Sequence, residues 1–138
     1  MTTRDELRTI LNNARTIAMV GASDKPDRDS YGVMEYLIAN EYRVIPVNPT
    51  AEQIQGERSY PSLTAIPEKV DVVDIFRRSD AVPPIVDEAI AIGASVVWMQ
   101  LGVVNEQAAE AARNAGLQVV MDRCIRIEHR RLIGGEGD

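Results

Sequence analysis

The chain is poor in the residues that build zinc sites and disulfide frameworks. Its 138 residues include one cysteine, Cys124, and one histidine, His129. A single cysteine cannot form a disulfide within the chain, and one cysteine with one histidine falls short of the four ligands of a structural zinc site. The sequence therefore excludes a disulfide-stabilised secreted fold and a zinc centre of the usual Cys/His kind.

Aromatic side chains and net positive charge are also scarce. Aromatic residues make up 4% of the chain, and 21 acidic residues against 15 basic ones give a formal net charge of -6. Nucleic-acid binding needs a basic surface, and single-strand binders add aromatic side chains on which bases stack. An anionic membrane likewise does not attract a net acidic surface. We therefore expect neither nucleic acid nor a membrane as a partner.

Long apolar segments are missing as well. No stretch approaches the roughly 20 apolar residues of a membrane-spanning helix, and the N-terminal segment MTTRDELRTILNNART lacks the apolar region of a secretion signal. We therefore expect a soluble cytoplasmic protein. Hydrophobic residues at 45% and charged residues at 26% are ordinary for a globular protein. The length predicts one domain over 1–138, with a flexible tail at 134–138.

Short apolar runs alternate with amphipathic stretches along the whole chain. Five apolar runs predict buried strands, at 16–21, 42–47, 70–76, 95–100 and 117–122. Helical spacing predicts helices at 3–14, 30–40, 80–92, 105–115 and 124–132. One short helical turn is also predicted at 62–66. Thr3 with Glu6 predicts a capping box at the first helix, and Ser30 is the predicted N-cap of the second. Because parallel strands need crossovers, the alternation predicts an α/β fold, a doubly wound five-stranded parallel sheet flanked by helices.

The residues that directly follow the strands are the candidates for a binding site. In doubly wound sheets, ligands bind beyond the carboxyl ends of the strands, where the strand order reverses. These positions are Gly21, Ala22, Ser23, Asn48, Pro49, Phe76, Arg77, Arg78, Ser79, Gln100, Leu101, Gly102, Asp122, Arg123 and Cys124.

The first of these loops is a candidate phosphate site. Gly21 ends the first strand, and small residues let backbone N–H groups approach an anion at the start of a helix. Lys25 and Ser30 would add a charge and a hydroxyl. The alternative is a strand–helix connection that needs glycine for packing. Ser23 stands where a dinucleotide fingerprint has its second glycine, and Asn48 where it has an acidic ribose ligand, so NAD and FAD are disfavoured.

Arg77 and Arg78 form a local exception to the acidic composition. Arginine suits bidentate recognition of phosphate, and both residues lie at the predicted binding edge. The alternative is that they pair with Asp74 or Asp80, or are solvated. Asp74 itself is not predicted to work with Asp71, because residues three apart on a strand point to opposite faces.

Cys124 is predicted to stand at the start of the last helix. A helix N-terminus and the neighbouring Arg123 and Arg126 favour the thiolate form of a cysteine. The alternative is a small buried residue. A catalytic pair with His129 is disfavoured, because residues five apart on a helix do not face each other.

The strand ends resemble those of a known family. The segments IAMVGASDKPDRDSYGV, YRVIPVNP, VDVVDIFRRSDAVPPIVDEAIAIGASVVWMQLG and VVMDRCIRIEH are similar to the small stand-alone CoA-binding proteins. That family is Rossmann-like and is related to the CoA-binding domain of the succinyl-CoA synthetase alpha subunit. The resemblance implies that a pyrophosphate lies against Gly21, Ala22 and Ser23, with Lys25 and Ser30 close by.

The resemblance also assigns the other strand ends to parts of CoA. It implies that the nucleotide lies at Asn48 and Pro49, and that Phe76, Arg77 and Arg78 flank the ligand. It also implies that the pantetheine arm lies along Gln100, Leu101 and Gly102, and that the thiol end lies near Cys124. CoA carries a 3′-phosphate, which a carboxylate at position 48 would repel, so asparagine fits there. Which of the basic residues Lys25, Arg28, Arg77 and Arg78 meets which phosphate stays open.

The expected function is non-catalytic binding of CoA or acyl-CoA, as a carrier, buffer or sensor. A mixed disulfide between Cys124 and the CoA thiol is a linked hypothesis. Two alternatives stay open: an acyl-CoA-dependent transferase or thioesterase with Cys124 as nucleophile, and an NAD(H)- or nucleotide-binding regulatory module. Related acyl-CoA ligases carry a phosphorylated histidine in a second domain, so ligase chemistry is not expected of this chain. A homo-oligomer or a protein partner is also left open.

Overall fold

The computed structural model describes residues 2–134. The predicted flexible tail at 134–138 lies, except for Gly134, outside the described residues. The helices are α1 (Arg4–Asn13), α2 (Asp29–Ala39), α3 (Val82–Ala91), α4 (Glu106–Asn114) and α5 (Ile125–Leu132), with short 3-10 helices η1 (Leu63–Ala65) and η2 (Ser79–Ala81). The strands are β1 (Thr16–Val20), β2 (Arg43–Val47), β3 (Gln53–Ile54), β4 (Glu57–Arg58), β5 (Val72–Ile75), β6 (Val96–Met99) and β7 (Gln118–Val120).

The main sheet has the strand order β2-β1-β5-β6-β7 within residues 2–134, and all its strands are parallel. The predicted α/β architecture with a five-stranded parallel sheet is therefore confirmed. The chain first winds from β1 outward to β2 and then returns across β1 to β5. The strand order consequently reverses between β1 and β5, which is where a doubly wound sheet opens a crevice for ligands.

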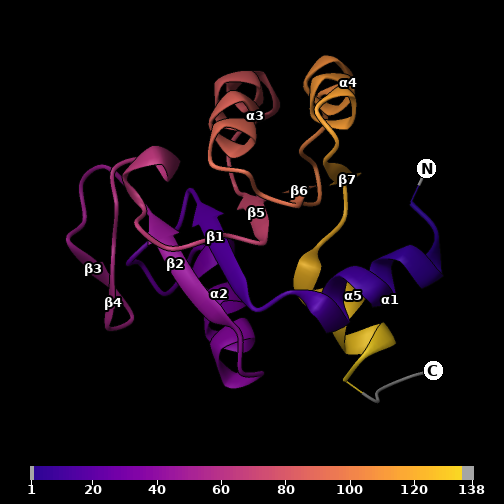
Figure 1. Ribbon diagram of the computed structural model, residues 1–138. Helices are drawn as coiled ribbons and strands as arrows, with labels where there is room; N and C mark the ends of the chain where they lie inside the picture. Colours follow the sequence, from indigo (N-terminus) through magenta and orange to yellow (C-terminus); the bar gives the residue numbers. More distant parts are fainter. Residues whose placement is uncertain (1, 135–138) are drawn as a thin grey trace.

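Helices cover both faces of the sheet, as Figure 1 shows. Helices α3 and α4 pack on one face, and α1, α2 and α5 pack on the other. Side chains alternate along each strand, so Val73 of β5 faces α3 and α4 whereas Val72 faces the other layer. Because both faces are covered, the strands are apolar along nearly their whole length.

The ends of α1 and α2 differ in how they are capped. Glu6 N–H donates to Thr3 Oγ1 at 3.1 Å, and Thr3 N–H donates to Glu6 Oε1 at 2.8 Å, which is the predicted capping box. The prediction of Ser30 as N-cap of α2 is wrong. Helix α2 begins at Asp29 after Arg28, because a turn in which Arg28 N–H donates to Lys25 O leads the chain into the helix earlier. No side chain in the described part of the chain caps this helix end.

The segment between β2 and β5 contains a hairpin in addition to the predicted helical turn. The turn near 62–66 is present as η1, and β3 pairs antiparallel with β4. Gln55 and Gly56 connect the two strands with φ of 52° and 81°. Positive φ at both residues is what a type I′ hairpin turn needs. The hairpin strands are two residues long, which is too short for an alternating pattern to predict them.

The described residues lack the features of a membrane span and of a metal site. None of the helices in the described part is long and apolar enough to cross a membrane. Within residues 2–134, no group of three or more His, Cys, Asp or Glu side chains is arranged to hold a metal ion.

Candidate functional site

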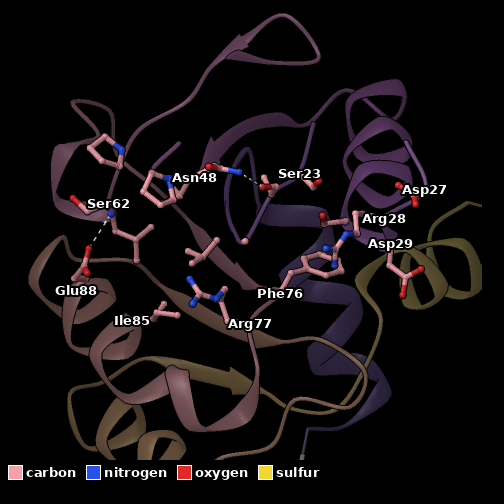
Figure 2. A pocket seen from close by; sticks show the side chains of 18 residues that line it. Ser23, Asp27, Arg28, Asp29, Asn48, Ser62, Phe76, Arg77, Ile85 and Glu88 are labelled. Atoms are coloured by element: carbon pink, nitrogen blue, oxygen red, sulfur yellow. Dashed lines mark hydrogen bonds between the residues drawn. The ribbon is translucent and has the colours of Figure 1, made fainter. Parts of the chain in front are cut away.

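A cavity of about 670 Å³ opens at the carboxyl edge of the sheet, where the strand order reverses. Figure 2 shows the side chains that line it. They come from the ends of β1, β2 and β5, from the start of α2, and from η1 and α3. The cavity therefore lies where a doubly wound sheet is expected to bind a ligand.

The first loop depends on Gly21 for its shape. Gly21 has a φ of +89°, and a Cβ atom at this position would collide with the carbonyl oxygen of Phe76. Its N–H donates to Val47 O at 3.2 Å, so it is not available to a ligand. Gly21 therefore meets a packing need, as one of the alternatives proposed, and its contact with a ligand stays a prediction. What the glycine does for the site is to let Ala22 and Ser23 pass close to β5 at the cavity wall.

The N-terminus of α2 faces the cavity without a side-chain cap. Arg28, Asp29 and Ser30 line this part of the wall. The first N–H groups of a helix have no intrahelical partner, and the helix dipole favours negative charge there. Asp27 and Asp29 also line the cavity, and in Figure 2 their side chains lie farther from its centre than Arg28 does. The arrangement suits an anion such as a phosphate.

The structure separates the two adjacent arginines. Arg77 lines the cavity, and its side chain lies close to Gly21, where a Cβ atom would be 3.1 Å from Arg77 Cδ. Arg78 is exposed and its Nε donates to Asp80 Oδ1 at 2.7 Å, as one of the alternatives proposed. Within residues 2–134, neither Arg28 nor Arg77 forms an ion pair. These two guanidinium groups are therefore the cations that the cavity offers to a ligand.

Asn48 connects the loop after β1 to the segment after β2. Its Nδ2 donates to Ala22 O at 2.9 Å, and its Oδ1 accepts from the N–H groups of Thr50 at 2.8 Å and Ala51 at 3.2 Å. The side chain is thus already engaged within the protein. Asn48 and the neighbouring Pro49 both line the cavity, but the hydrogen bonds make Asn48 a residue that positions the first loop.

The predicted site residues fall into two groups. Those that the cavity brings together are Gly21, Ala22, Ser23, Ser30, Asn48, Pro49, Phe76 and Arg77. Those that do not line it are Lys25, Arg78, Gln100, Leu101, Gly102 and Cys124. The role of every residue in both groups stays a prediction.

The second group lies mainly beyond β6 and β7, along the same edge of the sheet. Gln100 is buried, and its Oε1 accepts from Ile125 N–H at 3.0 Å, which fixes the start of α5. Leu101 is 65% exposed. Gly102 N–H donates to Asp122 Oδ1 at 2.7 Å. Cys124 is the half-buried N-cap residue of α5, so its predicted position at a helix start is correct.

One side of the cavity was not predicted. It is formed by Pro61, Ser62 and Leu63 around η1 and by Ile85 and Glu88 of α3. None of these residues directly follows a strand of the main sheet, so the strand-end rule cannot find them. A helical turn was expected near 62–66, but only the folded chain shows that it closes the cavity.

Two buried ionisable groups lie outside the cavity lining. Asp74 is fully buried in β5, and neither of its carboxyl oxygens has a hydrogen-bond partner among residues 2–134. Burial therefore raises the pKa of this carboxyl well above its usual value. His129 Nδ1 lies 2.7 Å from the Tyr36 hydroxyl, and burial lowers the pKa of the imidazole. Its ring packs edge-on against Tyr36 and Tyr42, which gives His129 a place in the packing of α5.

Comparison with known proteins shows which family the chain belongs to. A family model described as CoA binding domain matches residues 15–130. The chain belongs to this family of CoA binding domains. The match covers all five strands of the main sheet and every residue of the cavity wall, and it confirms the resemblance drawn from the strand-end motifs.

Several relatives of this CoA binding domain share its sequence and fold. It is 40% identical over 124 residues to the uncharacterized protein YneT of Bacillus subtilis, a match that covers 90% of this chain and 92% of YneT. A hypothetical protein from Pyrococcus horikoshii has a solved structure with a TM-score of 0.93 and 45% identity, covering 96% of this chain and 93% of that one.

A third relative is a larger enzyme subunit. The alpha subunit of an ADP-forming acetate–CoA ligase from Pyrococcus furiosus is 30% identical over 126 residues. The match covers 80% of this chain but 27% of the ligase subunit. The CoA binding domain thus corresponds to a minor part of that longer protein.

Proposed function

We propose that the chain binds CoA or acyl-CoA in the cavity and acts as a non-catalytic carrier, buffer or sensor. The observation that carries the proposal is the meeting of Arg28, Arg77 and the uncapped start of α2 at one cavity. CoA contains a pyrophosphate and a 3′-phosphate, and guanidinium groups bind phosphates through charge-assisted hydrogen bonds. Membership of the CoA binding domain family supports the same ligand.

The lining of the cavity supports binding rather than bond chemistry. It combines an anion-binding helix start with apolar side chains such as Val20, Leu63 and Ile85. Such a surface can hold a nucleotide without reacting with it. Because the chain spans 27% of the ligase subunit, ligase activity is not part of the proposal. A carrier or sensor also needs a protein, or a second copy, that responds to the loaded form.

Calorimetric titration with CoA, dephospho-CoA, NADH and ATP tests the proposal. We expect one CoA to bind per chain and NADH to bind far more weakly, because the first loop lacks a dinucleotide fingerprint. Dephospho-CoA should bind more weakly than CoA, since it lacks the 3′-phosphate. Binding of NADH without binding of CoA would overturn the proposal in favour of a dinucleotide-binding regulator.

We further propose that Cys124 forms a mixed disulfide with CoA. Three strand spacings separate β1 from β7, roughly 14 Å, a gap for the pantetheine arm to span along the edge of the sheet. The Cys124 thiolate would attack one sulfur of CoA disulfide, form the Cys124–CoA disulfide and release the other CoA as a thiolate. Leu101 and Gly102 follow β6, between the two loops, and would flank the arm.

Intact-mass measurement after incubation with CoA disulfide tests this step. We expect one CoA adduct on the wild type, reversed by a thiol reductant, and none on Cys124→Ser. Absence of the adduct from the wild type would reject the disulfide while leaving CoA binding untouched. Thioester hydrolysis that disappears in Cys124→Ser would instead favour an enzyme with a cysteine nucleophile.

A further inference from the structure

The cavity has a second end, which η1 and α3 form. In Figure 2, Glu88 and Ser62 lie on the side opposite Arg28. Leu63 and Ile85 form the wall there, and both are at least nine-tenths buried, with exposures of 1% and 9%. This end is therefore an apolar recess that contains the carboxylate of Glu88, whereas Asp27, Arg28 and Asp29 lie at the other end.

The carboxylate of Glu88 is held in a defined position. Its Oε1 accepts a hydrogen bond from Leu63 N–H at 2.9 Å, which ties α3 to the start of η1. Within residues 2–134, no arginine or lysine forms an ion pair with Glu88, and no hydrogen bond reaches its Oε2. One acceptor oxygen is thus fixed by the protein, and the other is left for a donor in the cavity.

A planar base with one exocyclic amino group fits this end of the cavity. The apolar side chains of Leu63 and Ile85 suit the faces of a purine, and a carboxylate oxygen accepts a hydrogen bond from an N–H group. Adenine presents an amino group at C6. Hypoxanthine and guanine present a carbonyl oxygen at the same position, which a carboxylate oxygen repels. Guanine could offer N1–H and its amino group to a carboxylate, but that pairing uses both oxygens and Oε1 is already engaged.

We propose that Glu88 selects adenine over 6-oxopurines by accepting a hydrogen bond from the amino group at C6. This inference rests on the proposed binding of CoA, and it adds a base specificity that no strand-end residue carries. It also explains why α3 contributes a half-buried carboxylate to a cavity that otherwise binds an anionic ligand. In Figure 2, Glu88 lies on the side opposite Arg28, and Arg77 lies between the two in this view.

The test compares CoA with its deaminated analogue, in which hypoxanthine replaces adenine. The protein variants are the wild type, Glu88→Gln and Asp87→Asn. In Glu88→Gln, the amide oxygen still accepts from Leu63 N–H, and the amide N–H₂ replaces the free acceptor by a donor. Asp87→Asn is the matched control, because Asp87 is the exposed neighbour on the same helix and does not line the cavity.

We expect the wild type and Asp87→Asn to bind CoA about tenfold or more tightly than the analogue, as the loss of a hydrogen bond to a charged group implies. Glu88→Gln should lose or reverse this preference while unfolding at nearly the same temperature as the wild type. An equal preference in wild type and Glu88→Gln would overturn the inference and leave CoA binding standing. Failure of the wild type to bind CoA at all would overturn the proposed function instead.

Discussion

Gly21 contacts the ends of the two strands that neighbour β1. Its N–H donates to Val47 O of β2, and its Cα packs against Phe76, which follows β5. A side chain there would meet the carbonyl oxygen of Phe76, and the residue also has a left-handed backbone conformation. Gly116 shares the left-handed conformation, with a φ of +93°, but a Cβ added there meets nothing within 4 Å. The two glycines therefore separate the cost of the backbone conformation from the cost of the collision.

We expect Gly21→Ala to destabilise the protein more than Gly116→Ala does. Both substitutions cost about 1–2 kcal/mol through the left-handed backbone, and Gly21→Ala adds a clash worth about 1–3 kcal/mol. Thermal and urea unfolding measure the two differences. Equal destabilisation by both substitutions would mean that the contact with Phe76 does not constrain the first loop.

Asp74 makes the stability of the protein depend on pH. The unfolded chain releases the proton of an aspartic acid near pH ~3.9, whereas the folded chain retains it because burial raises the pKa of Asp74. Between these two values the folded state binds one proton more than the unfolded state. The free energy of unfolding contributed by this group therefore falls as pH rises from about 4 toward the folded pKa.

We expect Asp74→Asn to remove this loss. The stability of the variant relative to the wild type should rise between pH 4 and pH 8, whatever constant cost the buried amide brings. Urea unfolding across this range measures the difference at each pH, with Asp87→Asn as an exposed control. A difference that does not change with pH would show that Asp74 is ionised in the folded protein.

At the scale of elements, the alternation of apolar runs and amphipathic stretches predicts the fold because each strand is buried on both faces. The runs at 42–47 and 95–100 correspond to β2 and β6 with shifts of one residue at their ends. The start of α2 was predicted wrongly, since Ser30 has the right side chain for a cap but a turn closes earlier in the chain. The capping preference of serine therefore did not set the start of α2; the turn between Lys25 and Arg28 did.

The cavity could be predicted only in part, for a similar reason. The rule that ligands bind beyond strand ends finds the walls built from the ends of β1, β2 and β5. It cannot find the wall built by η1 and α3, because Leu63 and Glu88 meet only when the chain is folded. Nor can it distinguish Arg77 from Arg78, since their different surroundings depend on the position of Asp80.

Asn48 connects two of these elements, and its replacement tests the connection. Asn48→Asp keeps an acceptor oxygen for the N–H groups of Thr50 and Ala51. It loses the donor to Ala22 O, and a carboxylate oxygen then faces that carbonyl oxygen and repels it. We expect a loss of about 1–3 kcal/mol of stability, together with weaker CoA binding. Asn12→Asp on the exposed side of α1 is the control, and calorimetry with thermal unfolding gives both quantities. If Asn48→Asp were destabilised but bound CoA as tightly as the wild type, the position of the first loop would not affect CoA binding.

At the scale of the whole molecule, the two arginines of the cavity stand within an acidic protein. The chain carries a formal charge of -6, whereas the cavity offers Arg28 and Arg77 to a ligand that is itself strongly anionic. Contacts between phosphates and exposed arginines weaken as salt screens them. Repulsion from the whole molecule would weaken as well, which would raise the affinity instead.

We expect the local attraction to dominate, because it acts at contact distance and the other charges are spread over the surface. The affinity for CoA should therefore fall as ionic strength rises from 0.05 M to 0.5 M, as calorimetry at several salt concentrations would show. An affinity that rises with salt would place the phosphates away from the two arginines.

The most direct test of the account is the affinity of CoA for Arg77→Gln compared with Arg78→Gln. The two arginines are adjacent in the sequence, but one lines the cavity and the other pairs with Asp80 outside it. We predict that Arg77→Gln weakens CoA binding about tenfold or more, the cost of a lost hydrogen bond to a charged group. Arg78→Gln should leave the affinity unchanged. A loss confined to Arg78→Gln, or a wild type that does not bind CoA, would contradict the placement of CoA in this cavity.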